Sequence, residues 1–107
     1  MSKISHLFAR RRDLLEDISA IEEMRRGSVI RQFLKVKLKG RKEPVLSGPY
    51  ALYTRKKKRK TVSRRLHDPA EVRRLEEQVE NYHVFRRLCA ELVEVSEEIC
   101  EEKDKGR

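Results

Sequence analysis

Apolar residues near the start of the chain recur at helical spacing, and acidic residues occupy the faces between them. The apolar positions are Leu7, Leu14, Ile18, Ile21 and Met24. Steps of three, four and seven residues return to one face of an amphipathic helix. Ser5 is a suitable N-cap, and Gly27 is a suitable C-terminal stop. The pattern therefore predicts a first helix over residues 5–26.

The periodicity changes to an alternation after Gly27. On one face of residues 29–38 the alternation places Ile30, Leu34, Val36 and Leu38. On the other face it places Arg31, Lys35 and Lys37. An alternation of this kind is typical of a half-buried strand, so we expect the apolar face to lie in the core.

A hairpin is predicted further along, after a basic loop that contains Gly40 and Pro44. Residues 50–55 and 60–66 have strand-like composition and flank a lysine-rich turn. No Asn-Gly or Asp-Gly pair marks this turn. The aromatic residues of the segment, Phe33, Tyr50 and Tyr53, are expected in the core of the sheet rather than as a surface on which bases stack.

The last apolar stripe is long and predicts a second helix over residues 68–103. Asp68 is a suitable N-cap, Pro69 fits the first helical position, and Glu71 lies in the first turn. The stripe consists of Val72, Leu75, Val79, Tyr82, Phe85, Leu88, Leu92, Val95 and Ile99. Two steps of three in succession, around Phe85, interrupt the heptad, so we expect a bend or a change of packing partner there.

Together these elements predict an α+β fold in a single domain over residues 1–107. An N-terminal helix precedes a three-stranded antiparallel sheet over residues 28–66, and the long helix follows. The stripe of the long helix can pack on the first helix or, as a coiled coil, on a second copy. We predict a partner-helix interface, and with it a homodimer, at Leu88, Leu92, Val95 and Ile99.

Charge is sorted along the chain. Residues 25–67 hold 16 lysines and arginines against Glu43 alone, which nets 16 − 1 = +15. Residues 1–24 net 4 − 5 = −1 and residues 68–107 net 7 − 12 = −5, which gives the total of +9. A block of positive charge creates a local electrostatic field that attracts phosphates, so the middle of the chain predicts a polyanionic partner.

The sequence offers little to support catalysis or a cofactor. It has no phosphate-cradling glycine loop, no clustered acids of the two-metal type and no nucleophile with an adjacent base. His6, His67 and His83 are far apart in the sequence. Cys89 and Cys100, eleven residues apart on a helix, would lie about 16 Å apart, too far for a disulfide. We therefore expect a non-enzyme with reduced thiols, no metal and no cofactor.

Four segments resemble a family of small basic prokaryotic proteins of unknown function that are often encoded next to transposases. They are residues 25–36 (RRGSVIRQFLKV), 47–50 (SGPY), 60–66 (KTVSRRL) and 79–88 (VENYHVFRRL). Many members carry a cysteine-rich, knuckle-like loop between the first strand and the Gly-Pro-Tyr turn. The corresponding residues 37–47 contain no cysteine or histidine. The resemblance therefore implies a transposon-linked accessory role without a metal site.

The predicted strands and helix also resemble, at the level of fold alone, the arm-type domains of tyrosine integrases and the plant AP2 domain. In those domains one sheet face lies in the DNA major groove. Here Thr61, Ser63 and Arg65 alternate to one face of the third strand. If the pairing register brings that face together with the bases of the first strand, the sheet presents a basic, hydroxyl-bearing surface suited to phosphates and base edges. Arg64 and Arg65 are expected to make directed contacts.

We therefore predict a DNA-binding accessory protein of a mobile element. The expected nucleic-acid contacts are Arg31, Lys35, Lys37, Lys39, Arg41, Lys42, Arg55, Lys56, Lys57, Lys58, Arg59, Lys60, Arg64 and Arg65. Alternatives are RNA binding, or an interaction subunit whose long helix binds a larger enzyme such as a transposase. No apolar stretch has the length of a membrane span and no signal-peptide order is present, so we expect a cytoplasmic protein without a membrane partner.

Overall fold

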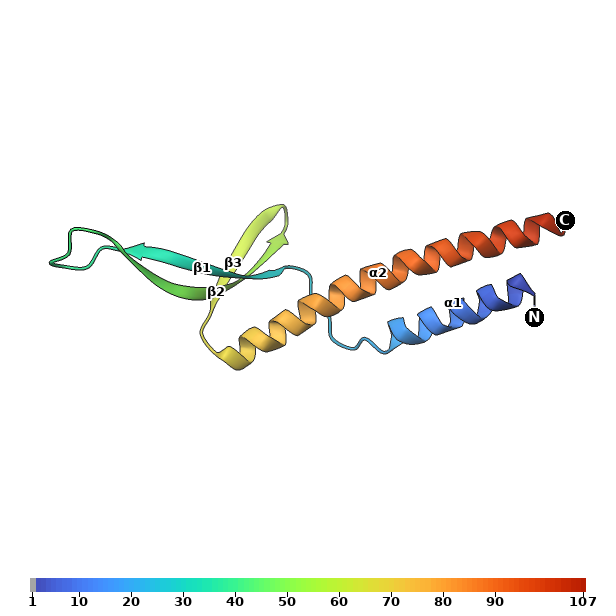
Figure 1. Cartoon of the computed structure of the whole chain (residues 1–107), viewed down its shortest axis with the longest axis horizontal. Coiled ribbons are helices and arrows are strands. Elements are labelled where there is room, and N and C mark those ends of the chain that lie inside the picture. Colours follow the sequence, from blue (N-terminus) through green and yellow to red (C-terminus); the bar gives the residue numbers. More distant parts are fainter. Residues whose placement is uncertain (1) are drawn as a thin grey trace. The chain divides into compact units, whose positions relative to one another are not determined.

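The computed structural model describes residues 2–107 and confirms the α+β class (Figure 1). The elements are α1 (Lys3–Ser19), β1 (Ser28–Val36), β2 (Val45–Lys57), β3 (Lys60–Leu66) and α2 (Pro69–Lys105). The chain divides into two compact units. One comprises the residues up to Met24 together with Glu80–Arg107, and the other comprises Arg25–Val79. The first unit is therefore a helix pair, and the second is the sheet with the start of α2.

Helix α1 runs antiparallel to the C-terminal part of α2 (Figure 1). Lys3 pairs with Glu102 at 3.4 Å and Arg10 with Glu91 at 3.1 Å, which fixes this direction. Between the two helices lies a core that includes Leu14, the side chain with no exposed surface. The apolar spacing of the N-terminal residues therefore predicted the buried face of α1 correctly.

The predicted bounds of the first helix, residues 5–26, are wrong at both ends. Ser2 is the N-cap and accepts a hydrogen bond from the backbone N–H of Ser5 at 3.2 Å. The helix ends at Ser19, whose hydroxyl donates to the carbonyl of Glu16 at 2.9 Å. Beyond it, the Asn81 amide donates to the carbonyl of Glu23 at 2.9 Å, so this segment bonds to α2 instead of continuing the helix.

The sheet has the order β1-β2-β3, and both pairings are antiparallel. Ala51, Tyr53 and Leu66 are buried from the sheet, and Val72, Leu75 and Val79 meet them from α2. Cross-strand partners share a face. Val29 and Arg64, the partners of Tyr53, therefore face α2 as well. The sheet accordingly has one face covered by α2 and one open face.

The expected core face of the first strand is wrong. Ile30 and Leu34 are each 43% exposed, Val36 is 36% exposed and Leu38 is 45% exposed. The residue of β1 that packs on the core is Val29, from the opposite face. The alternation itself is real, but α2 covers the face that carries Val29 and Arg31. Phe33, also expected in the core, is 56% exposed.

Helix α2 begins as predicted, and its stripe changes partner as expected. The Asp68 carboxylate accepts the backbone N–H of Ala70 at 3.0 Å, and Pro69 is the first helical residue. The stripe packs on the sheet as far as Val79 and on α1 from Val84 onward. Cys89 and Cys100 both lie on α2 as free thiols. Neither helix in the described part of the chain is long and apolar enough to cross a membrane.

Candidate nucleic-acid interface

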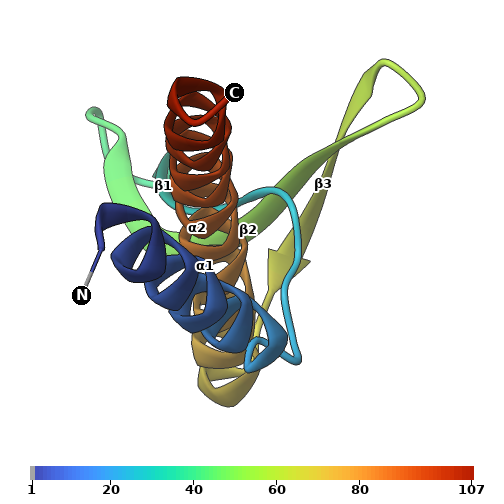
Figure 2. The same cartoon turned by 90° about the vertical axis from the view of Figure 1, so that its right-hand side faces the viewer.

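Most of the predicted contact residues lie on two projections of the sheet. We call residues 32–50 the β1–β2 arm, because β3 pairs only with Ala51 to Lys57 and leaves the rest as a two-stranded ribbon. Residues 55–60 form the basic turn. The tip of the β1–β2 arm and the basic turn project from different sides of the sheet unit (Figures 1 and 2). Basic side chains are thus presented at two separate points.

The β1–β2 arm carries five of the predicted basic residues, all of them exposed. They are Lys35, Lys37, Lys39, Arg41 and Lys42. Exposed apolar side chains lie among them, including Phe33 at 56% and Leu46 at 63%. A register shift between Gln32 and Leu34 bends the ribbon where it leaves the three-stranded part. The arm is therefore a basic ribbon with apolar side chains that no other element covers.

The basic turn is a tight two-residue connection. Lys58 has φ +52° and Arg59 has φ +68°, both in the left-handed region. Two consecutive residues of this kind form the type I′ turn that matches the twist of a hairpin. The six basic side chains of the turn are Arg55, Lys56, Lys57, Lys58, Arg59 and Lys60, and all of them are exposed.

Two of the predicted contact arginines face α2 rather than the open face. Arg31 pairs across the sheet with the buried Ala51, and its guanidinium donates to Glu76 at 3.0 Å. Arg64 pairs across the sheet with Tyr53 and forms an ion pair with Glu71. The pairing register therefore does not bring Arg31 onto the face of Ser63 and Arg65. Carboxylates of α2 offset the charge of both arginines.

The open face is less basic than predicted. Thr61, Ser63 and Arg65 do share it, because they pair with Lys56, Thr54 and Leu52. The residue of β1 beside Leu52 is Ile30. The Arg65 guanidinium carbon lies 3.5 Å from the centroid of the Tyr50 ring. Tyr50, expected in the core, is thus half-buried and stacked, and its hydroxyl lies 2.6 Å from that of Ser47.

The predicted partner-helix interface lies against α1. Leu88, Val95 and Ile99 are buried in the core of the helix pair, and Leu92 packs on it. Another helix could reach these side chains only after α1 had moved away. Within residues 2–107, no three histidine, cysteine or acidic side chains gather as a set of metal ligands.

Comparison of the chain with protein-family models, with curated proteins and with solved structures gives no match.

Proposed function

We propose that the protein is a non-catalytic DNA-binding protein that holds duplex DNA through the β1–β2 arm and the basic turn. The observation that carries the proposal is the placement of eleven exposed basic side chains, five on the arm and six on the turn. Among the described residues, none of the eleven forms an ion pair with a carboxylate. Such side chains are available to displace the counterions of a phosphate backbone.

The shape of the arm supports a groove as its docking place. The DNA major groove admits a two-stranded β-ribbon. In the arm, exposed Leu34 and Val36 alternate with Lys35 and Lys37. Apolar side chains can contact thymine methyl groups while lysines reach the phosphates on either side. The same arrangement favours DNA over duplex RNA, whose major groove is too deep and narrow for side chains to read.

An accessory role beside a transposase is part of the same proposal. The four sequence segments described above support it through their resemblance to transposon-linked proteins. The alternative, an interaction subunit that binds a larger enzyme through α2, requires the stripe that α1 already covers. We therefore keep DNA binding by the sheet unit as the proposed function.

A fluorescence-anisotropy titration tests the polymer class. The intact protein is titrated against a labelled DNA duplex, a single strand of the same sequence and a duplex RNA, each with and without heparin as competing polyanion. We expect duplex DNA to bind most tightly and to stay bound when heparin has removed the other two. Equal binding to all three polymers, abolished by heparin, would contradict the proposal because it would reduce the basic block to a general polycation.

A further inference from the structure

One side of the helix pair is lined by ion pairs between α1 and α2. The helix pair consists of α1 and residues 80–105 of α2, which lie side by side within one compact unit (Figure 2). Near the start of α1, Lys3 pairs with Glu102. Two turns further along α1, Arg10 pairs with Glu91. These contacts define the ion-pair side of the helix pair.

The opposite side of α1 is apolar. Ile4, Phe8 and Leu15 follow one another at steps of four and seven, so they share a stripe of the helix. Phe8 is two residues from Arg10 and therefore lies about half a turn around α1 from the ion-pair side. Phe8 is 42% exposed and Leu15 is 37% exposed. The ammonium nitrogen of Lys103 lies 5.4 Å from the centroid of the Phe8 ring, so Lys103 of α2 is on the same side as this stripe.

The matching side of α2 is apolar as well. Cys89, Ser96 and Lys103 follow one another at steps of seven and therefore share one side of the helix. Phe85 and Val93 lie four residues before and after Cys89 and extend this surface. Val93 is 56% exposed, and Phe85 and Cys89 are half-buried. We call the two stripes together the apolar side of the helix pair, and an exposed apolar patch of this kind indicates an interaction surface.

One charge of each sign borders the apolar side on α2. Arg86 lies seven residues before Val93, and Glu97 lies four residues after it, so both follow the same flank of the helix. Both side chains are exposed, and neither forms an ion pair within residues 2–107. Eleven residues of helix separate them by about 16 Å, so they do not pair with each other in one chain. The flank therefore offers both a cation and an anion to a partner.

A second copy of the chain satisfies both charges at once. A two-fold interface uses the same surface patch on both copies. When α2 of one copy runs antiparallel to α2 of the other, Arg86 of each copy comes opposite Glu97 of the other, and Val93 lies between the two pairs. A nucleic acid would satisfy only the arginine. The self-complementary flank thus favours a second copy as the occupant of the apolar side.

We propose that the apolar side of the helix pair is the interface of a homodimer. Two helix pairs form a four-helix bundle, in which α2 runs antiparallel to α2 of the second copy. This interface differs from the one predicted from the sequence, which α1 already covers. The proposal does not depend on DNA binding, because no residue of the β1–β2 arm or the basic turn takes part.

Sedimentation equilibrium of the intact protein tests the dimer, without DNA and with a reductant that keeps the thiols of α2 free. We expect twice the mass of the chain at micromolar concentration. Phe8→Glu puts a charge on the apolar side and should raise the dissociation constant of the dimer by about tenfold or more. His6→Glu is the matched control, because His6 is exposed and lies three residues after Lys3 and four before Arg10, on the ion-pair side.

Charge reversal tests the antiparallel contact between the two copies of α2. Arg86→Glu and Glu97→Arg should each weaken the dimer, because like charges then meet across the interface. The two changes together should restore the dissociation constant of the unaltered protein. Because the two positions are too far apart to pair within one chain, such restoration requires contact between copies. Circular dichroism of each variant checks that the helices remain folded.

Three outcomes would overturn the proposal. They are a monomer mass for the intact protein, equal dissociation constants for Phe8→Glu and His6→Glu, and no restoration when both charges are reversed. Loss of DNA binding by the arm and the basic turn would leave all of these results unchanged, so the two proposals fail separately.

Discussion

Gly27 is the residue whose replacement we expect to be most costly at the start of β1. Its φ is +128°, and a Cβ added there would lie 2.5 Å from the carbonyl oxygen of Thr54. Gly40 also has a positive φ, +88°, but a Cβ there meets no atom within 4 Å. Gly27→Ala should lower the free energy of unfolding by about 1–3 kcal/mol more than Gly40→Ala. Equal urea midpoints for the two variants would contradict this account of the close approach.

The pKa of the Glu102 carboxyl is shifted by its lysine neighbours. A hydrogen bond from Lys105, and with it Lys3, lowers the pKa of this carboxyl below its ordinary 4.5, against partial desolvation. Because the folded pKa is lowered, the stabilisation is present above the unfolded pKa and is lost as pH falls through the folded value. NMR titration should place the pKa of Glu102 below 4.5, and Lys105→Ala should raise it more than Lys3→Ala. A pKa that neither variant raises would show that the contacts are not formed in solution.

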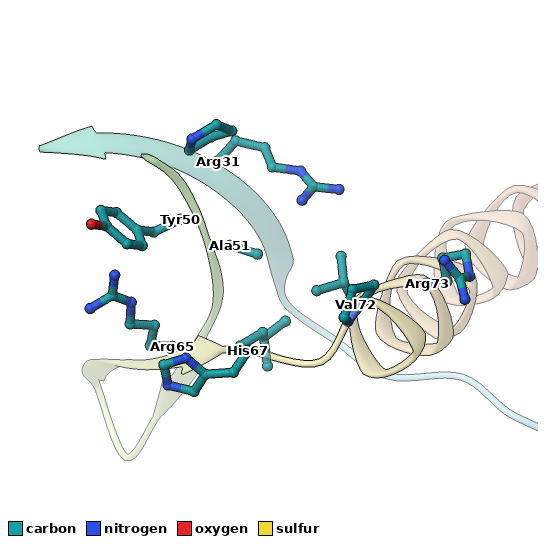
Figure 3. Close-up of a pocket in the computed structure, with 10 residues that line it drawn as sticks. Arg31, Tyr50, Ala51, Arg65, His67, Val72 and Arg73 are labelled. Carbon is teal, nitrogen blue, oxygen red and sulfur yellow. The ribbon is translucent and has the colours of Figure 1, made fainter. Parts of the chain in front are cut away.

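The identity of a residue does not reveal which face of the sheet each arginine occupies. The sequence shows that Arg31 and Arg65 lie on strands with alternating polar and apolar residues. Which face of the sheet each arginine occupies depends on the pairing register and on the face that α2 covers. The same limit applies to Tyr50 and His67. They line a hollow at the end of the sheet together with Arg31 (Figure 3), because three separate segments meet there. No single stretch of sequence carries that signal.

At the scale of the elements, Leu14 is the fully buried side chain through which α1 packs on α2. Its side chain has 0% exposure, whereas the adjacent Leu15 is 37% exposed. Leu14→Ala should therefore cost about 2–5 kcal/mol of stability through lost burial and the cavity left behind. Leu15→Ala should cost clearly less. Chemical denaturation followed by helical circular dichroism measures both, and equal losses would contradict the packing of α1 described here.

The elements were predictable where local pattern and capping chemistry agree. Asp68 and Pro69 marked the start of α2, and the break near Phe85 marked its change of packing partner. The end of α1 was not predictable. Its continued apolar pattern at Ile21 and Met24 fits a helix, but hydrogen bonds to α2 hold the following segment in another conformation. The tight turn at Lys58 and Arg59 also lacked a signal, since neither residue favours a positive φ.

At the scale of the molecule, the charge block is divided between inward and outward positions. Arg31 and Arg64 form ion pairs with carboxylates of α2, while the eleven basic side chains of the arm and the basic turn remain exposed. The sum of +15 over residues 25–67 was visible in the sequence. The sequence did not show which of these basic side chains pair with α2 and which stay exposed, because this depends on the sheet face that meets α2. The proposed DNA contact therefore involves the two projections rather than the whole basic segment.

The most direct test of this account is the salt dependence of duplex binding with the basic turn altered. Lys58→Asn with Arg59→Gly removes two charges but introduces the residue pair that favours a type I′ turn, so the hairpin should stay folded. Arg11→Gln with Arg12→Gln removes two exposed charges from α1 and is the matched control.

Binding constants are measured by anisotropy between roughly 50 and 200 mM salt. The account predicts that the turn variant weakens binding and reduces the slope of log K against log salt by about 1.8, which is 0.9 for each lost phosphate contact. The α1 control should keep the slope of the unaltered protein. Equal slopes for the two variants would contradict the account, because they would show that binding follows net charge and not the placement of the basic turn.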